Sequence, residues 1–269
     1  MPQPAFDARL LAALSELCSE AGRAILDVYD AEAVIVREKG DRSPVTDADE
    51  RAEDILHAGL AKLLPGVAVI AEEAASRDGV PDAAPDAFLL VDPLDGTREF
   101  LSRNGEFTVN VGLVVAGRPV GGCVHAPALG ATWIGADGLG ARKAVAPIRA
   151  TPADDAFIGI SVRQAAPGAL CAVASRSHSD AETEAFLERL GVTERRSAGS
   201  SLKFCLVAEG AADVYPRFGP TMEWDTAAGH AVLAAAGGAV TAPDGAPFRY
   251  GKSEAGFRNG GFVAWGRRG

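Results

Sequence analysis

The sequence has no surplus of positive charge, which limits the partners it can bind. Its 269 residues include 26 Lys and Arg against 36 Asp and Glu, for a formal net charge of −10. Cations are too few to favour polyanions nonspecifically, which argues against a histone-like or ribosomal role and against a nucleic acid partner. A chain of 269 residues can bury a large core, as two domains or as one large unit.

Cysteine is scarce, and long apolar runs are missing. The four cysteines, at positions 18, 123, 171 and 205, form no CxxC pair, which argues against a zinc site or a disulfide framework. The longest weakly polar stretch, residues 227–242, contains His230 and falls short of a bilayer span. Acidic residues near the start do not fit a secretory signal. We therefore expect no transmembrane helix and a cytoplasmic protein with buried, reduced thiols.

Hydrophobic periodicity predicts helices before strands in the first half of the chain. Apolar residues recur at helical spacing from Phe6 to an end near Asp30, and again over residues 46–64. Strand-like runs follow over residues 67–70, 88–91, 108–115 and 120–124, with a turn over 116–119 between the last two. Helices ahead of a run of strands favour an α+β class.

The second half alternates strands and helices, which favours an α/β class. Strands are predicted over residues 171–174 and 213–215, and helices over residues 180–190, 201–209 and 225–236. Because the pattern changes after residues 147–152, we predict two subdomains, 1–150 and 151–269, without a long linker between them.

Carboxylates gather after the strand predicted over residues 88–91. Because proline cannot donate a ladder hydrogen bond, we expect this strand to stop at Pro93. The turn that follows can bring Asp92 and Asp95 together with the Leu94 carbonyl. Three hard oxygen donors of this kind suit Mg²⁺ or Mn²⁺.

The next two residues, Gly96 and Thr97, extend this metal site toward an anion. Glycine lets the backbone approach a ligand closely, and a helix beginning at Thr97 would present free N–H groups beside the cation. The alternative is a set of ordinary turn acids, since Asp-Gly is a common turn dipeptide. Two acids and Gly-Thr directly after a buried strand favour the metal and phosphate site.

Other acids can complete the site, and each has a plainer alternative. Glu72 follows another predicted strand but can also face solvent in a loop. Asp225 stands at the start of the last helix and can be its N-cap. Thr46-x-x-Asp49 matches a capping box. Spacing alone does not bring these segments together.

Several segments resemble known signatures. Ala71-Glu-Glu73, Leu90-Val-Asp-Pro-Leu-Asp-Gly-Thr97 and Trp224-Asp-Thr-Ala-Ala-Gly229 resemble those of the inositol monophosphatase superfamily of Mg²⁺-dependent, Li⁺-inhibited phosphatases. Five more resemble its branch of bacterial bisphosphate nucleotidases: Asp41–Asp49, Asn104–Asn110, Ser175–His178, Gly199–Gly210 and Tyr215–Pro220. The resemblance runs from about residue 8 to residue 265 and implies a layered α/β/α/β/α sandwich.

The resemblance also implies roles for single residues. The metal ligands would be Glu72, Asp92, the Leu94 carbonyl, Asp95 and Asp225. The catalytic residues would be Asp49, Glu72 and Thr97, with Asp49 helping Thr97 to activate water, a role it can combine with capping. The substrate-binding residues would be Gly96, Thr97, His178, Ser200, Lys203, Arg217 and Asp225. Taken alone, Lys203 could be a solvated helix lysine and Arg217 part of a surface ion pair. Arg98 departs from the family pattern, in which Lys is usual.

The function implied is hydrolysis of the 3'-phosphate of 3'-phosphoadenosine 5'-phosphate (PAP) to AMP and phosphate, linked to sulfate assimilation and nucleotide recycling. Two or three Mg²⁺ ions would serve, Mn²⁺ could substitute and Li⁺ would inhibit. Lys203 and Arg217 would bind the second phosphate.

Other interpretations stay open. They are an inositol monophosphatase or histidinol-phosphate phosphatase of the same superfamily, a haloacid-dehalogenase-type phosphatase with a phosphoaspartate, and a catalytically silent nucleotide sensor. A homodimer also stays open, as does peripheral association with the cytoplasmic face of the inner membrane, for which the sequence shows no anchor.

Overall fold

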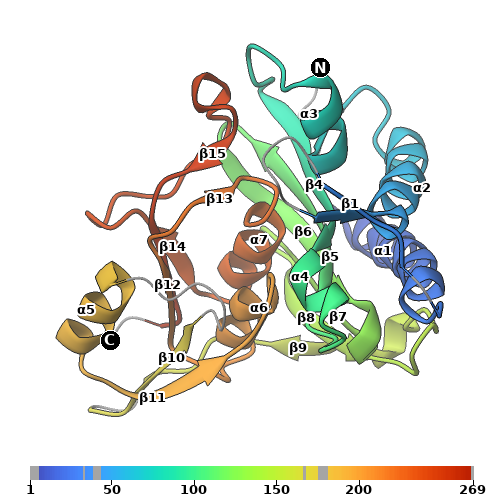
Figure 1. Cartoon of the computed structure of the whole chain (residues 1–269). Coiled ribbons are helices and arrows are strands. Elements are labelled where there is room, and N and C mark those ends of the chain that lie inside the picture. The colour runs from blue at the N-terminus through green and yellow to red at the C-terminus, as the bar shows by residue number, and fades with distance from the viewer. Residues whose placement is uncertain (1–5, 33, 39–43, 166–167, 175–180, 268–269) are drawn as a thin grey trace.

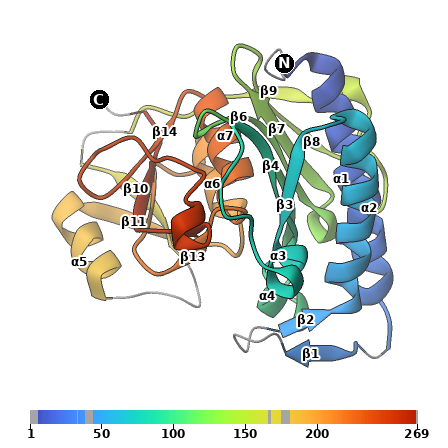
Figure 2. The ribbon, with the colours of Figure 1, turned by 90° about the horizontal axis from the view of Figure 1, so that it is seen from above.

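The chain folds into five layers in which helices and sheets alternate (Figures 1 and 2). The computed structural model describes residues 6–32, 34–38, 44–165, 168–174 and 181–267. The outer helices α1 (Ala8–Tyr29) and α2 (Asp47–Leu63) cover a seven-stranded sheet. Helices α6 (Leu202–Ala208) and α7 (Ala227–Ala235) fill the middle layer, a five-stranded sheet follows, and α5 (Ala181–Leu190) lies outermost. The layered α/β/α/β/α sandwich is confirmed.

The seven-stranded sheet carries most of the chain's first half. Its strands run in the order β3-β4-β5-β6-β7-β8-β9. Strand β3 pairs in parallel with β4, and every other neighbouring pair is antiparallel. The bounds are β3 (Ala68–Ala71), β4 (Ala87–Asp95), β5 (Thr108–Val115), β6 (Arg118–Ala126), β7 (Ala131–Ala136), β8 (Gly140–Val145) and β9 (Ile158–Ile160).

This sheet is buried on both faces because helices cover each of them. Its strands place successive side chains on opposite faces, so alternate residues enter different cores. On β4, Leu89 and Val91 join the core under α1 and α2, whereas Phe88 and Leu90 join the core under α6 and α7. The central strands are therefore continuously apolar rather than alternating.

Helix α7 lies unusually close to the first sheet because glycines face it from three adjacent strands. A β-carbon on Gly112 would lie 2.8 Å from the Ala228 nitrogen, and one on Gly122 would lie 2.9 Å from the Ala228 α-carbon. A β-carbon on Gly135 would lie 3.0 Å from the Val232 α-carbon. The missing side chains let the N-terminal end of α7 approach β5 and β6.

The second sheet has the strand order β11-β10-β12-β16-β14. Strand β10 is parallel to β11 and β12, whereas β16 is antiparallel to both β12 and β14. The bounds are β10 (Leu170–Ala174), β11 (Val192–Ser197), β12 (Val214–Arg217), β14 (Ala239–Thr241) and β16 (Phe262–Trp265).

Short elements complete the fold. Strands β1 (Val36–Glu38) and β2 (Pro44–Thr46) pair with each other, as do β13 (Thr221–Met222) and β15 (Arg258–Asn259). Helix α3 (Glu72–Asp78) follows β3, and α4 (Thr97–Leu101) follows β4. Short 3₁₀ helices cover Pro127–Leu129, Asp154–Ala156 and Ser253–Ala255.

Two local expectations are wrong. Strand β4 does not stop at Pro93 but continues to Asp95, because Pro93 and Leu94 form a bulge between the pairs Asp92–Asn110 and Asp95–Thr108. A bulge leaves residues out of the ladder and therefore tolerates proline. The predicted turn over 116–119 is only two residues long, since β6 already begins at Arg118. Both turn residues have positive φ, as a two-residue hairpin requires.

Other expectations hold or stay predictions. None of the helices in the described ranges combines the length and apolarity that a bilayer span needs. All four cysteines lie in those ranges and are buried free thiols. Strand β9 lies after residue 150 in the chain but pairs within the first sheet. The subdomain boundary at residue 150 stays a prediction.

The tight contact at α7 yields a stability prediction. We expect Gly112→Ala to destabilise the protein by about 1–3 kcal/mol, because the added methyl group meets the backbone of α7 and overpacks the core. Urea denaturation measures the difference. The matched control is Gly159→Ala in β9, where a β-carbon meets nothing within 4 Å. Equal midpoints for the two variants would contradict the close approach of α7.

Candidate metal and phosphate site

Three carboxylates from separate segments meet at one end of the first sheet. Glu72 begins α3 directly after β3, Asp92 lies in β4, and Asp225 precedes α7. One carboxylate oxygen from each lies within 4.8 Å of the others. The parallel β3–β4 register pairs Ala71 with Val91, which places Glu72 beside Asp92. The close packing of α7 on the sheet then brings in Asp225.

The bulge in β4 orients the next part of the site. The Leu94 N–H donates to Asp92 Oδ1 at 3.0 Å. The Leu94 carbonyl accepts from the Thr97 hydroxyl at 3.4 Å. Asp95 lines the same cavity as Glu72 and Asp225, but its Oδ2 accepts from Ser200 Oγ at 2.8 Å and Asn110 Nδ2 at 3.3 Å. Asp95 therefore lies beside the three-carboxylate cluster and is held by Ser200 and Asn110.

Asp49 caps α2 and also contacts Thr97. Its Oδ2 accepts from the Thr46 N–H at 2.8 Å and the Thr46 hydroxyl at 2.7 Å, which completes the capping box of α2. Its Oδ1 accepts from the Thr97 hydroxyl at 3.5 Å. Because Asp49 is 1% exposed, the cap holds a buried carboxylate in contact with Thr97.

Two of the plainer alternatives are wrong. Asp225 is not the N-cap of α7, which begins at Ala227 after Thr226. Its Oδ2 instead accepts from the Met222 N–H at 2.8 Å. Lys203 is not a solvated helix lysine, since it is 6% exposed.

Gly96 shapes the backbone between Asp95 and Thr97. It has a φ of 93° and precedes α4, which begins at Thr97 as the sequence predicts. Glycine adopts this left-handed conformation without steric cost. Gly96 and Thr97 both line the cavity, beside Asp95 and Glu72.

Two cationic side chains, Lys203 and Arg217, also line the cavity. Lys203 Nζ donates to the Ser200 carbonyl at 2.5 Å and lies 5.4 Å from the centre of the Tyr215 ring. Burial, opposed in part by Asp95, lowers the pKa of Lys203 to about 8. Arg217 Nη2 donates to the Pro220 carbonyl at 3.2 Å. Its buried Nε has no hydrogen-bond partner among the described residues.

Ser200 connects Asp95 with Lys203. Its hydroxyl donates to Asp95 and also contacts the Thr108 hydroxyl, while its carbonyl accepts from Lys203. Its φ of 53° is left-handed, a conformation that costs free energy in a residue with a side chain. The surrounding contacts hold Ser200 in this conformation at the centre of the site.

The structure thus brings nearly all of the predicted residues to one place. Asp92 and Asp49 are buried behind the cavity, and His178 lies outside the described residues. Sequence reasoning gave no site role to other residues of the cavity wall: Pro44, Arg98, Glu99, Phe204, Tyr215, Pro220, Thr221 and Thr226. Most of them fall inside or next to the motifs quoted above, which is the signal that could have indicated them.

The electrostatics of the cluster fit a hard divalent cation. Burial, followed by the neighbouring Asp95 and Glu72, raises the pKa of the Asp225 carboxyl well above its ordinary value. Crowded carboxylates of this kind cannot all stay ionised without a compensating positive charge. Carboxylate and carbonyl oxygens are the ligands that Mg²⁺ and Mn²⁺ prefer.

Comparisons with known proteins place the chain. The sequence profile of the inositol monophosphatase family matches residues 7–262, and the chain belongs to this family. It is 46% identical to the 3'(2'),5'-bisphosphate nucleotidase CysQ of Escherichia coli (strain K12) over 254 residues, which cover 94% of this chain and 98% of that protein. The relative of the same name from Buchnera aphidicola is 37% identical over 265 residues, covering 95% of this chain and 93% of that protein.

A solved structure agrees with this assignment. The crystal structure of CysQ from Bacteroides thetaiotaomicron, a bacterial member of the inositol monophosphatase family, has a TM-score of 0.80 at 37% identity and covers 98% of this chain and 99% of that chain. The resemblance deduced from the motifs is confirmed.

The crowded carboxylates predict a metal-dependent stability. In metal-free protein the raised pKa means that protonated Asp225 contributes stability below about pH 4, the ordinary value, and that this contribution is lost as the pH rises through the folded-state pKa. Mg²⁺ at about 100 times its Kd should restore about 2.7 kcal/mol at neutral pH. For a chain of this size that is a rise in Tm of roughly 5–10 °C.

The variant Asp225→Asn tests the cause. It removes one charge from the cluster, so we expect a flatter pH dependence without metal and a much smaller rise in Tm with Mg²⁺. Differential scanning calorimetry with and without a chelator measures both. A Mg²⁺-induced rise equal to that of the unmodified protein would show that Asp225 is not a ligand.

Proposed function

We propose that this protein is a Mg²⁺-dependent 3'(2'),5'-bisphosphate nucleotidase that converts PAP and water into AMP and phosphate. The observation that carries the proposal is the composition of one cavity. Its wall includes the carboxylates of Glu72 and Asp225 together with the cationic side chains of Lys203 and Arg217. A substrate with two phosphates needs both features: a metal site for the phosphate that leaves and cations for the phosphate that stays.

Glu72, Asp92 and Asp225 would hold the metal, with the Leu94 carbonyl and Asp95 as further donors. Bound Mg²⁺ would offset the negative charge of the phosphate and lower the pKa of water at the site. The residues around it are assigned to orient the reactants. The N–H groups of Gly96 and Thr97 would donate to phosphoryl oxygens, as donors placed where charge develops do in other enzymes.

The Thr97–Asp49 contact supports a path for the water proton. The Thr97 hydroxyl can donate to Asp49 Oδ1, so Thr97 would accept a proton from water as its own proton passes to Asp49, while Glu72 orients that water. Two donors from Thr46 occupy Asp49 Oδ2, so Oδ1 is the oxygen that faces Thr97. The water oxygen would bond to phosphorus as the bond to the ribose 3'-oxygen breaks, the leaving oxygen would take a proton from solvent water, and no covalent phosphoenzyme would form.

Lys203 and Arg217 would bind the phosphate that remains. The Lys203 pKa of about 8 leaves this side chain mostly protonated at neutral pH. Arg217 lines the same cavity, so its guanidinium group can donate to an anion bound there. A charged hydrogen bond from guanidinium to phosphate is strong and directional.

The alternatives receive less support. An inositol or histidinol phosphate phosphatase would use the same carboxylates but has no need for a second group of cations. A phosphoaspartate enzyme of the haloacid-dehalogenase type does not fit membership of the inositol monophosphatase family. The cytoplasmic location, the absence of a nucleic acid partner and the homodimer stay predictions.

A substrate panel tests the activity directly. With Mg²⁺ we expect phosphate release from PAP to exceed release from inositol 1-phosphate and histidinol phosphate by at least tenfold in kcat/KM. Of these substrates, only PAP has a second phosphate that the cations of the cavity can bind. Mn²⁺ should support the reaction and added Li⁺ should inhibit it. Higher kcat/KM on inositol 1-phosphate would overturn the proposed substrate, and binding of PAP without phosphate release would favour the nucleotide sensor.

Arg217→Gln tests the second-phosphate site. Loss of a charged hydrogen bond of about 1.5–3 kcal/mol should lower kcat/KM for PAP by roughly 10–150-fold. Steady-state kinetics should show little change on inositol 1-phosphate, which lacks the second phosphate. Arg118→Gln is the control, since Arg118 is an exposed arginine that pairs with Asp137 away from the cavity. Equal losses on both substrates would remove this role from Arg217.

A further inference from the structure

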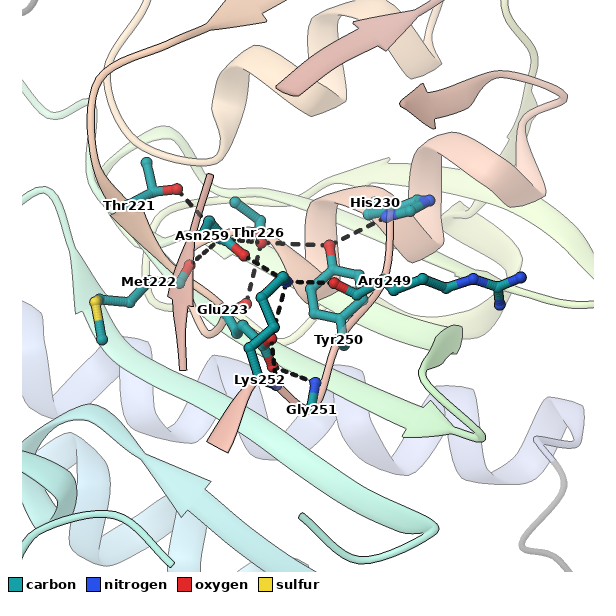
Figure 3. Close-up of polar contacts among 10 residues, drawn as sticks. All are labelled: Thr221, Met222, Glu223, Thr226, His230, Arg249, Tyr250, Gly251, Lys252 and Asn259. Carbon is teal, nitrogen blue, oxygen red and sulfur yellow. Dashed lines mark hydrogen bonds and ion pairs between the residues drawn. The ribbon is translucent and has the colours of Figure 1, made fainter. Parts of the chain in front are cut away.

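A polar network joins the segment before α7 to β15 and to the loop that precedes β15 (Figure 3). Its acidic member is Glu223, whose side chain is 0% exposed. The Glu223 carboxylate accepts from the Gly251 N–H at 2.7 Å, the Lys252 N–H at 3.0 Å and the Lys252 ammonium at 3.0 Å. These contacts attach the segment before α7 to the loop between β14 and β15.

Asn259 on β15 is the second anchor of the same segment. Its Oδ1 accepts from Lys252 Nζ at 3.1 Å. Its Nδ2 lies 2.7 Å from the Met222 carbonyl, 3.1 Å from Thr226 Oγ1 and 3.2 Å from Thr221 Oγ1 (Figure 3). Nδ2 has two hydrogens for three acceptors, and the shortest contact is the one to Met222.

Met222 connects Asn259 to Asp225 through hydrogen bonds. The Met222 N–H donates to Asp225 Oδ2 at 2.8 Å, and the Met222 carbonyl accepts from the Asp225 N–H at 3.3 Å. One residue therefore binds both the backbone and the carboxylate of Asp225. Asn259 holds that residue from the other side.

Asp225 needs such support because its surroundings oppose its position. Glu72 and Asp92 bring carboxylate oxygens within 4.8 Å of its own, and like charges at that distance repel. A carboxylate in this place turns away unless other contacts fix its direction. Hydrogen-bonded neighbours of a metal ligand supply this direction, and their loss lowers metal affinity.

We propose that Asn259, held by the Lys252–Glu223 ion pair, is a positioning residue that fixes the direction of the Asp225 carboxylate and thereby sets the affinity of the site for a divalent cation. The inference rests on the proposed function in one respect, which is the assignment of Asp225 as a metal ligand. It gives the loop between β14 and β15, which adds no side chain to the cavity wall, a part in the chemistry.

The test is a titration of the full-length protein with Mn²⁺. Electron paramagnetic resonance of the free ion measures how much Mn²⁺ is bound. In Asn259→Leu, a side chain of similar size donates nothing to Met222. Loss of the hydrogen-bonded support of a ligand typically weakens binding about 10–100-fold, and we expect a change of that size. Near-ultraviolet circular dichroism at low temperature confirms that the variant is folded.

A second variant tests the same role without leaving a buried charge unpaired. The double variant Glu223→Gln with Lys252→Met removes both charges of the ion pair together, so neither charge is left uncompensated. It also removes the ammonium that orients Asn259, so Mn²⁺ binding should weaken in the same direction. The matched control is Glu209→Gln with Lys143→Met. That pair has a similar separation of 2.8 Å, and its lysine also lies over an aromatic ring, that of Trp133.

Activity provides a second readout. For both test variants we expect PAP hydrolysis to fall at low Mg²⁺ and to recover at saturating Mg²⁺, because the defect lies in metal affinity. A general loss of structure would lower activity at every Mg²⁺ concentration. The control pair should bind Mn²⁺ within twofold of the unmodified protein.

The outcomes separate this inference from the proposed function. If Asp225→Asn binds Mn²⁺ weakly while Asn259→Leu binds it normally, the positioning role is wrong and the ligand assignment stands. If Asp225→Asn itself binds Mn²⁺ normally, the ligand assignment fails and the positioning role fails with it. Weakening of the control pair to the same extent as the test pair would also overturn the inference.

Discussion

Repulsion among clustered carboxylates is the constraint on which the rest of this structure depends. Glu72, Asp92 and Asp225 come from three segments that are far apart in the chain, yet their oxygens lie within 4.8 Å of one another. Burial and the neighbouring acids raise the pKa of Asp225, which means that the folded chain pays free energy to assemble the cluster without metal. The packing that enforces the cluster therefore serves the metal rather than the stability of the metal-free chain.

Two features of the fold overcome this repulsion. The parallel register of β3 and β4 sets Glu72 beside Asp92, and glycines on β5, β6 and β7 let α7 approach until Asp225 reaches them. Neither feature involves a charged group. A large apolar core thus supplies the free energy that holds a small cluster of charges in place, which is how functional sites in proteins are generally stabilised.

The sequence predicted the elements whose pattern is local. Helices α1 and α2 have clear apolar periodicity, and the capping box at Asp49 was visible from spacing alone. Strand β4 was misjudged at Pro93 because a bulge, which depends on the partner strand, removes the hydrogen bond that proline cannot make. Strands β7 and β8 were missed, since alanine and glycine give short runs such as residues 131–136 little distinctive pattern.

The residues of the site also divide into those that local spacing indicates and those that it does not. Asp92, Asp95 and Gly96 lie close together in the chain, so spacing indicated them, whereas Glu72 and Asp225 joined them only through the family resemblance. The support of Asp225 by Asn259 could not be read from the sequence at all. It depends on the pairing of two-residue strands, β13 with β15, and on the half-buried Lys252, which contacts Asn259.

The cations and the acids of the cavity are connected through Ser200. Its carbonyl accepts from Lys203 and its hydroxyl donates to Asp95, so hydrogen bonds join a cation to an acid of the cavity. Under the proposed function, an anion that binds Lys203 would draw this ammonium away from the Ser200 carbonyl and so alter the field at Asp95. Recognition of the second phosphate and arrangement of the metal site would then be coupled through one strained residue, and a substrate with one phosphate would engage only half of that arrangement.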